Sequence, residues 1–232
     1  MSMRLKMNKS IILLSGGLDS LVALSYCQKH TDYNIELALT FDYGQKAINE
    51  EIDASKKIAD FYNIKHKVIK LDWLKEITNT SLVADKEVPY EDFETINSMK
   101  SVWVPNRNSL FLNIAAAFAD SYNYNYIIYG ANKDEANTFR DNTEEFRTQI
   151  SKCFETSTIV KPKVIAPLIN YSKGDIVEMA IRDSVPLEYV RSCYNSGEKH
   201  CGKCESCHYL KNALLKNNCQ EYINLLFKND EN

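Results

Sequence analysis

The stretch that decides the fold is Ile11–Leu24, which reads IILLSGGLDSLVAL. Its first four residues form a continuous apolar run, the pattern of a β-strand buried on both faces, and residues at helical spacing follow the Ser-Gly-Gly turn. A glycine turn between a strand and a helix brings backbone N–H groups and a helix N-terminus close together. Because such groups bind anions, the turn predicts a phosphate site.

This turn differs from two common phosphate-binding loops. No G-K-[ST] follows as in a Walker A loop, and the third glycine of the dinucleotide pattern is absent. A carboxylate beside a phosphate is repulsive unless a cation lies between them, so we interpret Asp19 as a Mg²⁺ or water-shell contact. Ser15 and Ser20 supply further hydroxyl donors. The competing interpretation is a tight strand-to-helix turn with Asp19 as an ordinary first-turn acid.

Strands and helices alternate along the rest of the chain. Apolar runs predict further strands at 35–41, 66–71, 126–130 and 163–168. Helices are expected from residue 21 onward, over 47–62, over 107–122 and from residue 173 behind a capping-box-like start. Residues 73–105 are poorly periodic and are interpreted as a long excursion. The alternation predicts an α/β fold, a Rossmann-like doubly wound parallel sheet whose ligands lie at the carboxyl ends of the strands.

Two details of these helices are also predicted. Asn63 is expected to end the second helix. The third helix is expected to turn inward its residues Leu110, Phe111, Ile114, Ala115 and Phe118.

Composition argues against several classes of protein. The chain of 232 residues has 28 Lys+Arg against 31 Asp+Glu, a net charge of −3, which suits small-molecule chemistry and not a broad nucleic-acid surface. Its apolar runs fall far short of the roughly 20 residues of a membrane span. The first ten residues, MSMRLKMNKS, lead into too few apolar residues for a secretory signal, which needs roughly 7–15. We therefore expect a cytoplasmic protein without a membrane or stable nucleic-acid partner.

Four of the seven cysteines are crowded into residues 193–207. In a reducing compartment such crowding indicates a metal rather than disulfides. Four thiolates suit a closed tetrahedral Zn²⁺ site. An iron–sulfur cluster is the alternative, although Lys211 stands where the ferredoxin pattern has its fourth cysteine. His200 and His208 flank the cluster and could replace one thiol. The predicted zinc ligands are Cys193, Cys201, Cys204 and Cys207.

SGGLDS resembles the phosphate loop of the ATP pyrophosphatase (PP-loop) group, which cleaves ATP to AMP and pyrophosphate to adenylate an acyl-type oxygen. The similarity extends over almost the whole chain. FDYGQ (41–45), VPNRN (104–108), APL followed by SKGDI, and SCY with CGKCESC occur in the order and spacing of the 7-cyano-7-deazaguanine synthase (QueC) family. Each motif alone is weak, but the combination is specific.

The resemblance implies a reaction and its cofactors. ATP would adenylate the carboxylate of 7-carboxy-7-deazaguanine, ammonia would displace AMP to give an amide, and a second ATP would dehydrate the amide to 7-cyano-7-deazaguanine. With no obvious nucleophile in the sequence, catalysis would depend on positioning and charge stabilisation. The resemblance also implies Mg²⁺ with the ATP, Zn²⁺ on the cysteines, and a homodimer.

The residues implied to hold ATP come from three motifs. Asp19 and Arg107 are the expected catalytic residues, and Arg107 stands just before a helix whose N-terminus could share its anion. A solvated loop arginine is the alternative for that position. The expected ATP contacts are Leu14, Ser15, Gly16, Gly17, Leu18, Asp19, Ser20, Leu21, Phe41, Tyr43, Gln45, Arg107 and Asn108.

The segment after residue 130 departs from the family pattern. The family has an Asp-Cys-Arg triplet in its substrate pocket, where this chain has Asp141, Asn142 and Thr143. The aspartate of the triplet is present as Asp141, but asparagine and threonine replace the cysteine and the arginine. We expect substrate contacts from Lys133, Arg140 and Asp141, and the candidates for replacing the missing cation are Arg140, Arg147 and Lys133. Lys211 likewise stands where the family has an arginine.

The altered pocket keeps a second function open. A divergent relative would adenylate the same deazaguanine acid and conjugate it to another amine, including one on a protein, in an antiviral defence system. An RNA-modifying thiolase of the same ATP group is a third hypothesis, against which the net charge and the four committed cysteines argue. In each case we expect a nucleotide-binding domain over 1–185 and a zinc-binding C-terminal segment over 186–232.

Overall fold

Five parallel strands form one sheet at the centre of the protein, in the order β3-β2-β1-β4-β5. The computed structural model describes residues 8–84, 86–90 and 100–228. The strand predictions are confirmed, with slightly different bounds. The strands are β1 (Asn8–Leu13), β2 (Tyr33–Asp42), β3 (Lys65–Lys70), β4 (Tyr126–Ile128) and β5 (Lys163–Ile165).

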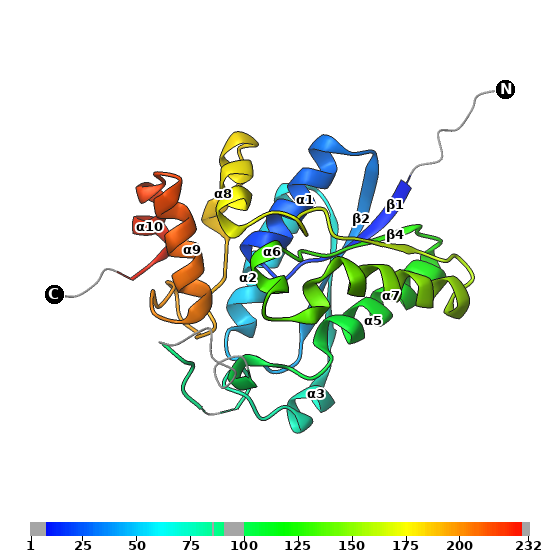
Figure 1. Cartoon of the computed structure of the whole chain (residues 1–232), viewed down its shortest axis with the longest axis horizontal. Coiled ribbons are helices and arrows are strands. Elements are labelled where there is room, and N and C mark those ends of the chain that lie inside the picture. The colour runs from blue at the N-terminus through cyan, green and yellow to red at the C-terminus, as the bar shows by residue number, and fades with distance from the viewer. Residues whose placement is uncertain (1–7, 85, 91–99, 229–232) are drawn as a thin grey trace.

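Helices cover both faces of the sheet, so the predicted doubly wound architecture is confirmed (Figure 1). Side chains alternate along β1, and Ile12 packs in the core cluster of α1 and α2 whereas Ile11 packs in that of α5 and α7. The helices before α8 are α1 (Leu18–His30), α2 (Ile48–Phe61), α3 (Asp72–Ile77), α5 (Arg107–Tyr122), α6 (Lys133–Ala136) and α7 (Glu144–Ser157).

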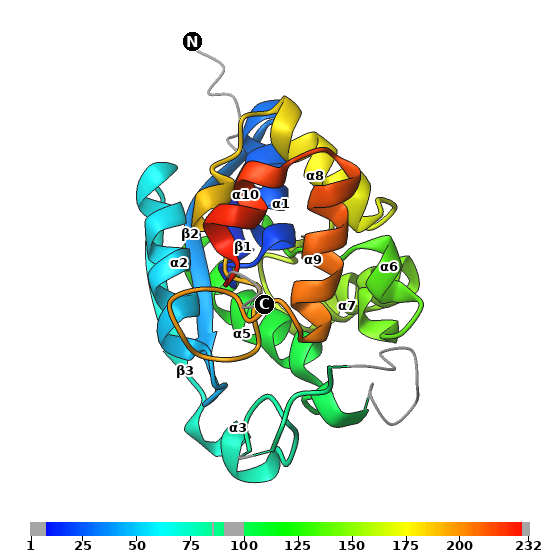
Figure 2. The same ribbon diagram turned by 90° about the vertical axis from the view of Figure 1, so that its left-hand side faces the viewer.

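The last part of the chain extends one of these two cores. It comprises α8 (Lys173–Arg182), α9 (Glu205–Lys216) and α10 (Gln220–Leu226), which lie together beside α1 (Figures 1 and 2). Leu210 and Leu214 of α9 belong to the same buried cluster as the apolar residues of α1. Burial of apolar surface therefore holds the C-terminal segment against the sheet domain.

Local signals in the sequence explain several helix ends. Ser172 and Asp175 form a capping box at the start of α8, as predicted. Asn63 follows α2 in the left-handed conformation, with φ 53°, which fits its predicted role as the stop of that helix.

The predicted inward face of α5 is confirmed at Ala115, whereas its other four residues pack against the core only partly buried. The buried residues of this helix are Leu112, Ala115, Ala116 and Ala119, whereas the four larger residues named from the sequence are half-buried. Three alanines let the helix approach the sheet closely, so the small residues rather than the large ones occupy the contact. Phe111 is displaced to the side, where its ring stacks on Phe41 with 4.0 Å between centroids.

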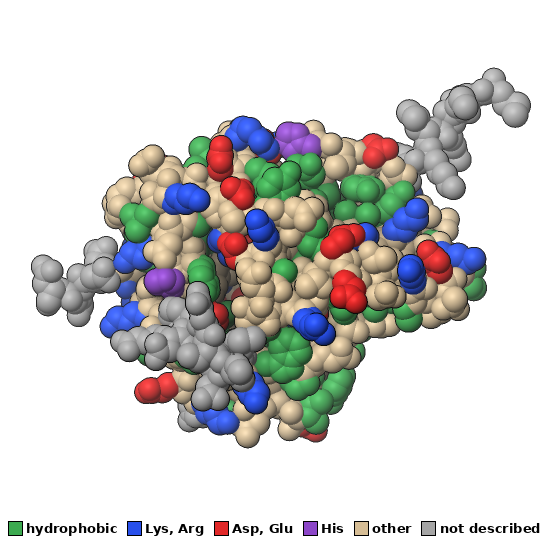
Figure 3. All heavy atoms as spheres, in the orientation of Figure 1, with side chains coloured by type: hydrophobic (Ala, Val, Ile, Leu, Met, Phe, Trp, Pro, Cys, Tyr) green, Lys and Arg blue, Asp and Glu red, His purple; other side chains and the backbone are tan. Residues whose placement is uncertain are grey.

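The segment 73–105 is only partly an excursion, because its first residues belong to α3. Residues 85 and 91–99 of it lie outside the described part of the chain. Within the described residues, no helix is both long and apolar enough to cross a bilayer. Acidic and basic side chains are interspersed over the face drawn in Figure 3, in keeping with the small net charge.

Candidate functional site

The candidate site lies at the carboxyl end of β1, where the chain turns into α1. From β1 the sheet grows toward β2 on one side and toward β4 on the other. A parallel sheet opens at such a switch point, and ligands bind outside the strand ends there. The Ser15-Gly16-Gly17 turn occupies this position, as the sequence predicted.

The turn leaves the N-terminus of α1 open. Gly16 has φ +79°, and a Cβ built on it would come within 2.9 Å of the Ala54 Cβ, so only glycine fits. Gly17 is the N-cap and provides no side-chain cap, so the first N–H groups of α1 lack the partner that a capping side chain would supply. The Ser20 hydroxyl braces the turn by donating to the Gly17 carbonyl at 3.0 Å and accepting from Ser15 N–H at 3.2 Å. The uncapped helix end fits an anion.

A second glycine brings the end of β4 against this helix end. A Cβ on Gly130 would lie 2.7 Å from the Ser20 amide nitrogen and 2.8 Å from the Asp19 carbonyl carbon. No side chain fits such a gap, since real Cβ atoms do not approach backbone atoms so closely. Gly130 therefore allows α6, which follows β4, to reach the first turn of α1.

Asp19 faces a lysine that was not predicted from the sequence. The Lys173 Nζ lies 2.6 Å from Asp19 Oδ2 and 3.2 Å from Glu135 Oε1, and Lys173 is mostly buried. Burial works against the charged amine, but the two carboxylates together raise the pKa of Lys173. Burial raises the pKa of Asp19, although the positive charge of Lys173 opposes this rise. For Glu135 the attraction of Lys173 outweighs burial and lowers the pKa.

Some buried polar atoms around this group have no partner in the described part of the chain. They include Asp19 Oδ1 and the Asn132 Nδ2, although Asn132 is fully buried and its Oδ1 accepts a hydrogen bond from the Glu135 N–H at 3.0 Å. Buried polar groups are normally satisfied. Unpaired atoms beside an open helix end indicate a place for ligands.

Arg107 begins α5 and is directed into the same region. Its Nη1 lies 3.4 Å from the Tyr43 hydroxyl, and it interacts electrostatically with Asp141 and Tyr194. Burial raises the pKa of Asp141. The charge of Arg107 and a hydrogen bond from the backbone of Asn108 oppose this rise. The predicted residues Arg107, Asn108 and Asp141 therefore lie together, at the N-terminus of α5.

The motif at the end of β2 has mainly buried side chains. Gln45 donates from Nε2 to Glu51 Oε2 at 2.8 Å and to the Phe41 carbonyl at 2.9 Å, and its Oε1 accepts from the Tyr43 N–H at 3.0 Å. These hydrogen bonds hold the turn at the end of β2 in place. Phe41 and Gln45 are buried beneath this turn and support it. The side chains of Leu14, Leu18 and Leu21 are likewise in the core, so the contacts expected of them from the sequence fall to their backbone atoms.

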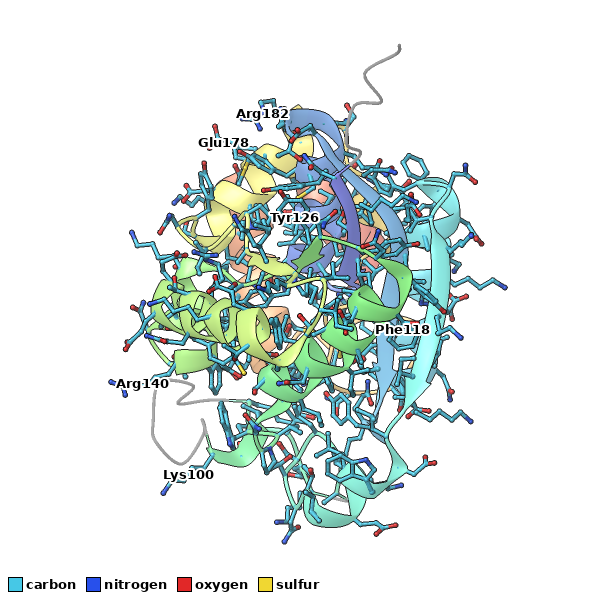
Figure 4. All side chains as sticks on the ribbon, turned by 90° about the vertical axis from the view of Figure 1, so that its right-hand side faces the viewer. Lys100, Phe118, Tyr126, Arg140, Glu178 and Arg182 are labelled. Carbon is cyan, nitrogen blue, oxygen red and sulfur yellow. The ribbon has the colours of Figure 1, made fainter. Side chains whose placement is uncertain are left out.

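Two of the cations expected to replace the missing arginine, Arg140 and Arg147, are directed away from the Arg107–Asp141 group. Arg147 pairs with Glu144 and donates to the Val164 carbonyl at 2.8 Å, so its guanidinium is held beside β5. Arg140 is exposed at the outer side of the molecule (Figure 4), and Lys133 is exposed as well. Thr143, at the position of that arginine, caps α7 by accepting from the Phe146 N–H at 3.2 Å. Among the described residues, the cations beside Asp141 and Glu135 are Arg107 and Lys173.

The four clustered cysteines are brought together as predicted. One sulfur from each of Cys193, Cys201, Cys204 and Cys207 lies within 4.8 Å of the others, so the group could hold a metal ion. Backbone N–H groups point at two of the sulfurs, from Cys201 to Cys193 Sγ and from Cys204 to Cys201 Sγ, both at 3.4 Å. Such donors stabilise thiolates. His200 and His208 are not part of this group in the described structure.

The cysteine segment also packs against the Ser15-Gly16-Gly17 turn. The Arg191 N–H donates to the Gly16 carbonyl at 2.8 Å, and the Gly197 N–H donates to Glu50 Oε1 at 2.7 Å. Tyr194 interacts electrostatically with Glu205, Glu135 and Arg107. The segment that carries the metal ligands therefore lies against one side of the candidate site.

Several residues of the site could not be found from the sequence. Lys173, Glu135, Tyr194 and Glu205 come from α8, α6 and the C-terminal segment. The motif SKGDI contains Lys173, which was the available signal. Tyr194 and Glu205 stand inside the motifs SCY and CGKCESC, in which the cysteines were the residues singled out, and Glu135 stands in a stretch without a recognised motif.

The comparisons with known proteins agree with this arrangement. Residues 9–218 match the family model described as queuosine biosynthesis protein QueC. The chain is 45% identical over 232 residues to a 7-cyano-7-deazaguanine synthase of Methanosarcina barkeri, covering 94% of this chain and 100% of that one. It is 47% identical over 213 residues to the synthase of Carboxydothermus hydrogenoformans, covering 89% and 98%.

A solved structure shares the fold. The NMN synthetase of Francisella tularensis superposes with a TM-score of 0.50 at 19% identity, over 96% of this chain and 84% of that one. This likeness concerns the arrangement of the sheet and helices alone.

Proposed function

Because this chain belongs to the queuosine biosynthesis protein QueC family, we propose that it is a 7-cyano-7-deazaguanine synthase that uses ATP to convert 7-carboxy-7-deazaguanine and ammonia into the nitrile. The observation that carries the proposal is the 45% identity that runs the full length of a synthase. The phosphate turn and the four cysteines both fall inside the matched residues.

The first step activates a poor electrophile. A carboxylate oxygen of the substrate attacks the α-phosphorus of ATP, the bond to the β-phosphate oxygen breaks, and pyrophosphate leaves. The open N-terminus of α1 is suited to bind the pyrophosphate portion, because its N–H groups lack a capping side chain. Lys173 and Arg107 supply positive charge where negative charge builds up, which lowers the barrier without a covalent enzyme intermediate.

The second and third steps form the nitrile. Ammonia attacks the acyl carbon, and AMP leaves with the oxygen that was adenylated. The amide oxygen then attacks a second ATP, and loss of that AMP leaves a carbon–nitrogen triple bond. These steps need an acyl group held near the helix end and away from water, and the C-terminal segment closes that side.

Two metal ions fit the residues present. Asp19 Oδ1, which has no hydrogen-bond partner in the described structure, suits a contact to Mg²⁺ or its water shell, and the ion would neutralise phosphate charge. The four sulfurs would fill the tetrahedral coordination shell of a Zn²⁺ ion and leave no position for a substrate, which suits a structural ion. We propose that the protein works as a homodimer in the cytoplasm.

The test is to incubate the protein with 7-carboxy-7-deazaguanine, ATP, Mg²⁺ and ammonium, and to identify the products by mass spectrometry. The proposal predicts the nitrile together with AMP and pyrophosphate. Consumption of ATP without nitrile at saturating ammonium would contradict it and would favour the conjugating alternative, to which the synthases found above lend no support.

A further inference from the structure

The carbonyl oxygen of Leu14 accepts hydrogen bonds from two buried hydroxyl groups. Leu14 is the first residue after β1 and directly precedes the Ser15-Gly16-Gly17 turn. Thr40 Oγ1 of β2 donates to this oxygen at 2.6 Å, and Ser55 Oγ of α2 donates to it at 3.1 Å. A carbonyl oxygen has two lone pairs, so the two hydroxyls use its whole capacity as an acceptor. The carbonyl is thus held from two different elements of the fold.

A histidine on the neighbouring strand fixes the direction of the Thr40 hydrogen bond. His66 Nε2 of β3 lies 2.8 Å from Thr40 Oγ1. Thr40 has one hydroxyl proton, which is directed at Leu14, so the imidazole donates its own proton to the Thr40 oxygen. Thr40 and Ser55 are 1% and 0% exposed, so water does not compete for their hydrogen bonds. These buried bonds therefore converge on the Leu14 carbonyl.

The opposite side of the same peptide group is held as well. The peptide group is planar and trans, so the Leu14 carbonyl and the Ser15 N–H point in opposite directions. The Ser15 N–H donates to Ser20 Oγ at 3.2 Å, and this hydroxyl donates to the Gly17 carbonyl at 3.0 Å. The peptide between Leu14 and Ser15 is therefore fixed both from the core and from the first turn of α1.

The orientation of this peptide decides which of its backbone groups faces a phosphate. A rotated peptide would exchange the places of the carbonyl oxygen and the N–H, and would bring partial negative charge to the side of α1 on which an anion would bind. Helix α2 packs directly against the turn, since a Cβ on Gly16 would lie 2.9 Å from Ala54 Cβ and 3.3 Å from Ser55 Oγ. Thr40 and Ser55 are buried behind the turn, so they can affect phosphate binding only through the backbone.

We propose that Thr40 and Ser55 are positioning residues for ATP, which hold the Leu14–Ser15 peptide in the orientation that keeps its carbonyl oxygen away from the phosphates. This rests on the proposed function, in which the turn binds the pyrophosphate portion of ATP. A peptide that is held before ATP arrives need not be ordered during binding, which favours affinity. The two hydroxyls should therefore affect the affinity for ATP and not that for the deazaguanine acid.

The experiment measures both binding and turnover with the full-length, metal-loaded protein. Thr40→Val removes one hydroxyl at nearly constant volume, and Ser55→Ala removes the other. The dissociation constant of Mg·ATP, measured by calorimetry without the acid, is expected to rise about 3-fold in each single variant and at least about 10-fold in the double variant. Thr40→Ser keeps a hydroxyl and should stay within about 2-fold of wild type. In nitrile formation the KM for ATP should rise, whereas the KM for the acid should stay within about 2-fold.

Ser10→Ala is the matched control, because Ser10 is a fully buried serine of β1 whose hydroxyl has no partner among the described residues. It should change none of these constants. Wild-type affinity for Mg·ATP in the double variant would overturn the proposal, and so would an equal loss of affinity in Thr40→Val and Thr40→Ser. Should the double variant fail to fold, the two single variants decide by the same criteria. Binding of Mg·ATP by the wild-type protein without formation of the nitrile would count against the proposed function alone, whereas no binding of Mg·ATP would overturn both.

Discussion

The amine of Lys173 lies 2.6 Å from the carboxylate of Asp19, although 154 residues separate them in the chain. The pair joins the first turn of α1 to the start of α8, and Glu135 of α6 completes it at 3.2 Å. Because Lys173 is shared, neither carboxylate is fully neutralised. A phosphate that entered here would meet an ammonium group already held in place.

Asp19→Ala is expected to reduce pyrophosphate release at least about 100-fold, as removal of a group that stabilises developing charge commonly does. The fold should persist, because Glu135 still pairs with Lys173. Pyrophosphate release and Tm are the measurements. Asp53→Ala is the control, since Asp53 is exposed in its pair with Lys57. Wild-type release from Asp19→Ala would refute the assignment of the phosphate turn. We expect Ser15→Ala to lose activity as well.

Gly130→Ala is expected to impair ATP use more than it impairs folding. The added methyl group would meet backbone atoms of Asp19 and Ser20 at under 3 Å and push α6 away from the helix end. We expect the KM for ATP to rise several-fold. Gly174→Ala provides the comparison, because its added carbon meets only the flexible side chain of Lys216 at 3.3 Å. Equal effects of the two changes would contradict this explanation.

Arg107 is expected to matter for the substrate more than the three cations named from the sequence. It is the arginine that lies beside Asp141, whereas Arg147 is held by Glu144 and Arg140 faces outward. Arg107→Met should raise the KM for the deazaguanine acid at least about 10-fold, since its carboxylate would lose a buried counter-charge. Arg140→Met should change it little. A larger rise of this KM in Arg140→Met than in Arg107→Met would contradict the prediction and favour Arg140.

One metal ion per chain is expected, and elemental analysis should identify zinc rather than iron. Cys201→Ser should lower Tm, because a closed thiolate site contributes to folding. It should also raise the KM for ATP, since the segment that carries the ligands donates a hydrogen bond from Arg191 to Gly16. Cys153→Ser, a change at an exposed cysteine outside the cluster, should do neither. A fully stable Cys201→Ser variant would be inconsistent with a structural site.

Glu36 gives a prediction about pH. Burial tends to raise its pKa, but the bonds from Lys9 at 3.0 Å and the Tyr124 hydroxyl at 2.9 Å outweigh it and lower the pKa below the usual 4.5. A depressed carboxyl stabilises the fold above its unfolded pKa, and this contribution disappears as pH falls through the folded value. The Tm difference between wild type and Glu36→Gln should therefore be larger at pH 7 than at pH 3.5. An equal difference at both pH values would exclude this linkage.

The sheet and the cysteine cluster could be predicted because their signals are local. Apolar runs mark the strands, and the spacing of Cys201, Cys204 and Cys207 places three ligands on one short segment. The same holds for the glycine turn between β1 and α1, whose binding of phosphate stays a prediction. Each depends on residues close together in the sequence.

The polar network could not be predicted in the same way. The contact of Lys173 with Asp19 depends on how α8 crosses the sheet end, which no local pattern encodes. The true role of Thr143 as a helix cap, and the outward position of Arg140, also depend on where α7 begins. The inward face of α5 was predicted only in part, because small residues such as Ala116 and Ala119 occupy the contact where the helix approaches the sheet closely.

The central claim is that both substrate oxygens leave on AMP at this site. The most direct test uses 7-carboxy-7-deazaguanine with ¹⁸O in both carboxylate positions, followed by mass spectrometry of the AMP and the deazapurine product. Two AMP are expected per nitrile, each carrying one ¹⁸O in its phosphate. Nitrile formed with unlabelled AMP, and the label in water or inorganic phosphate instead, would contradict activation by adenylation.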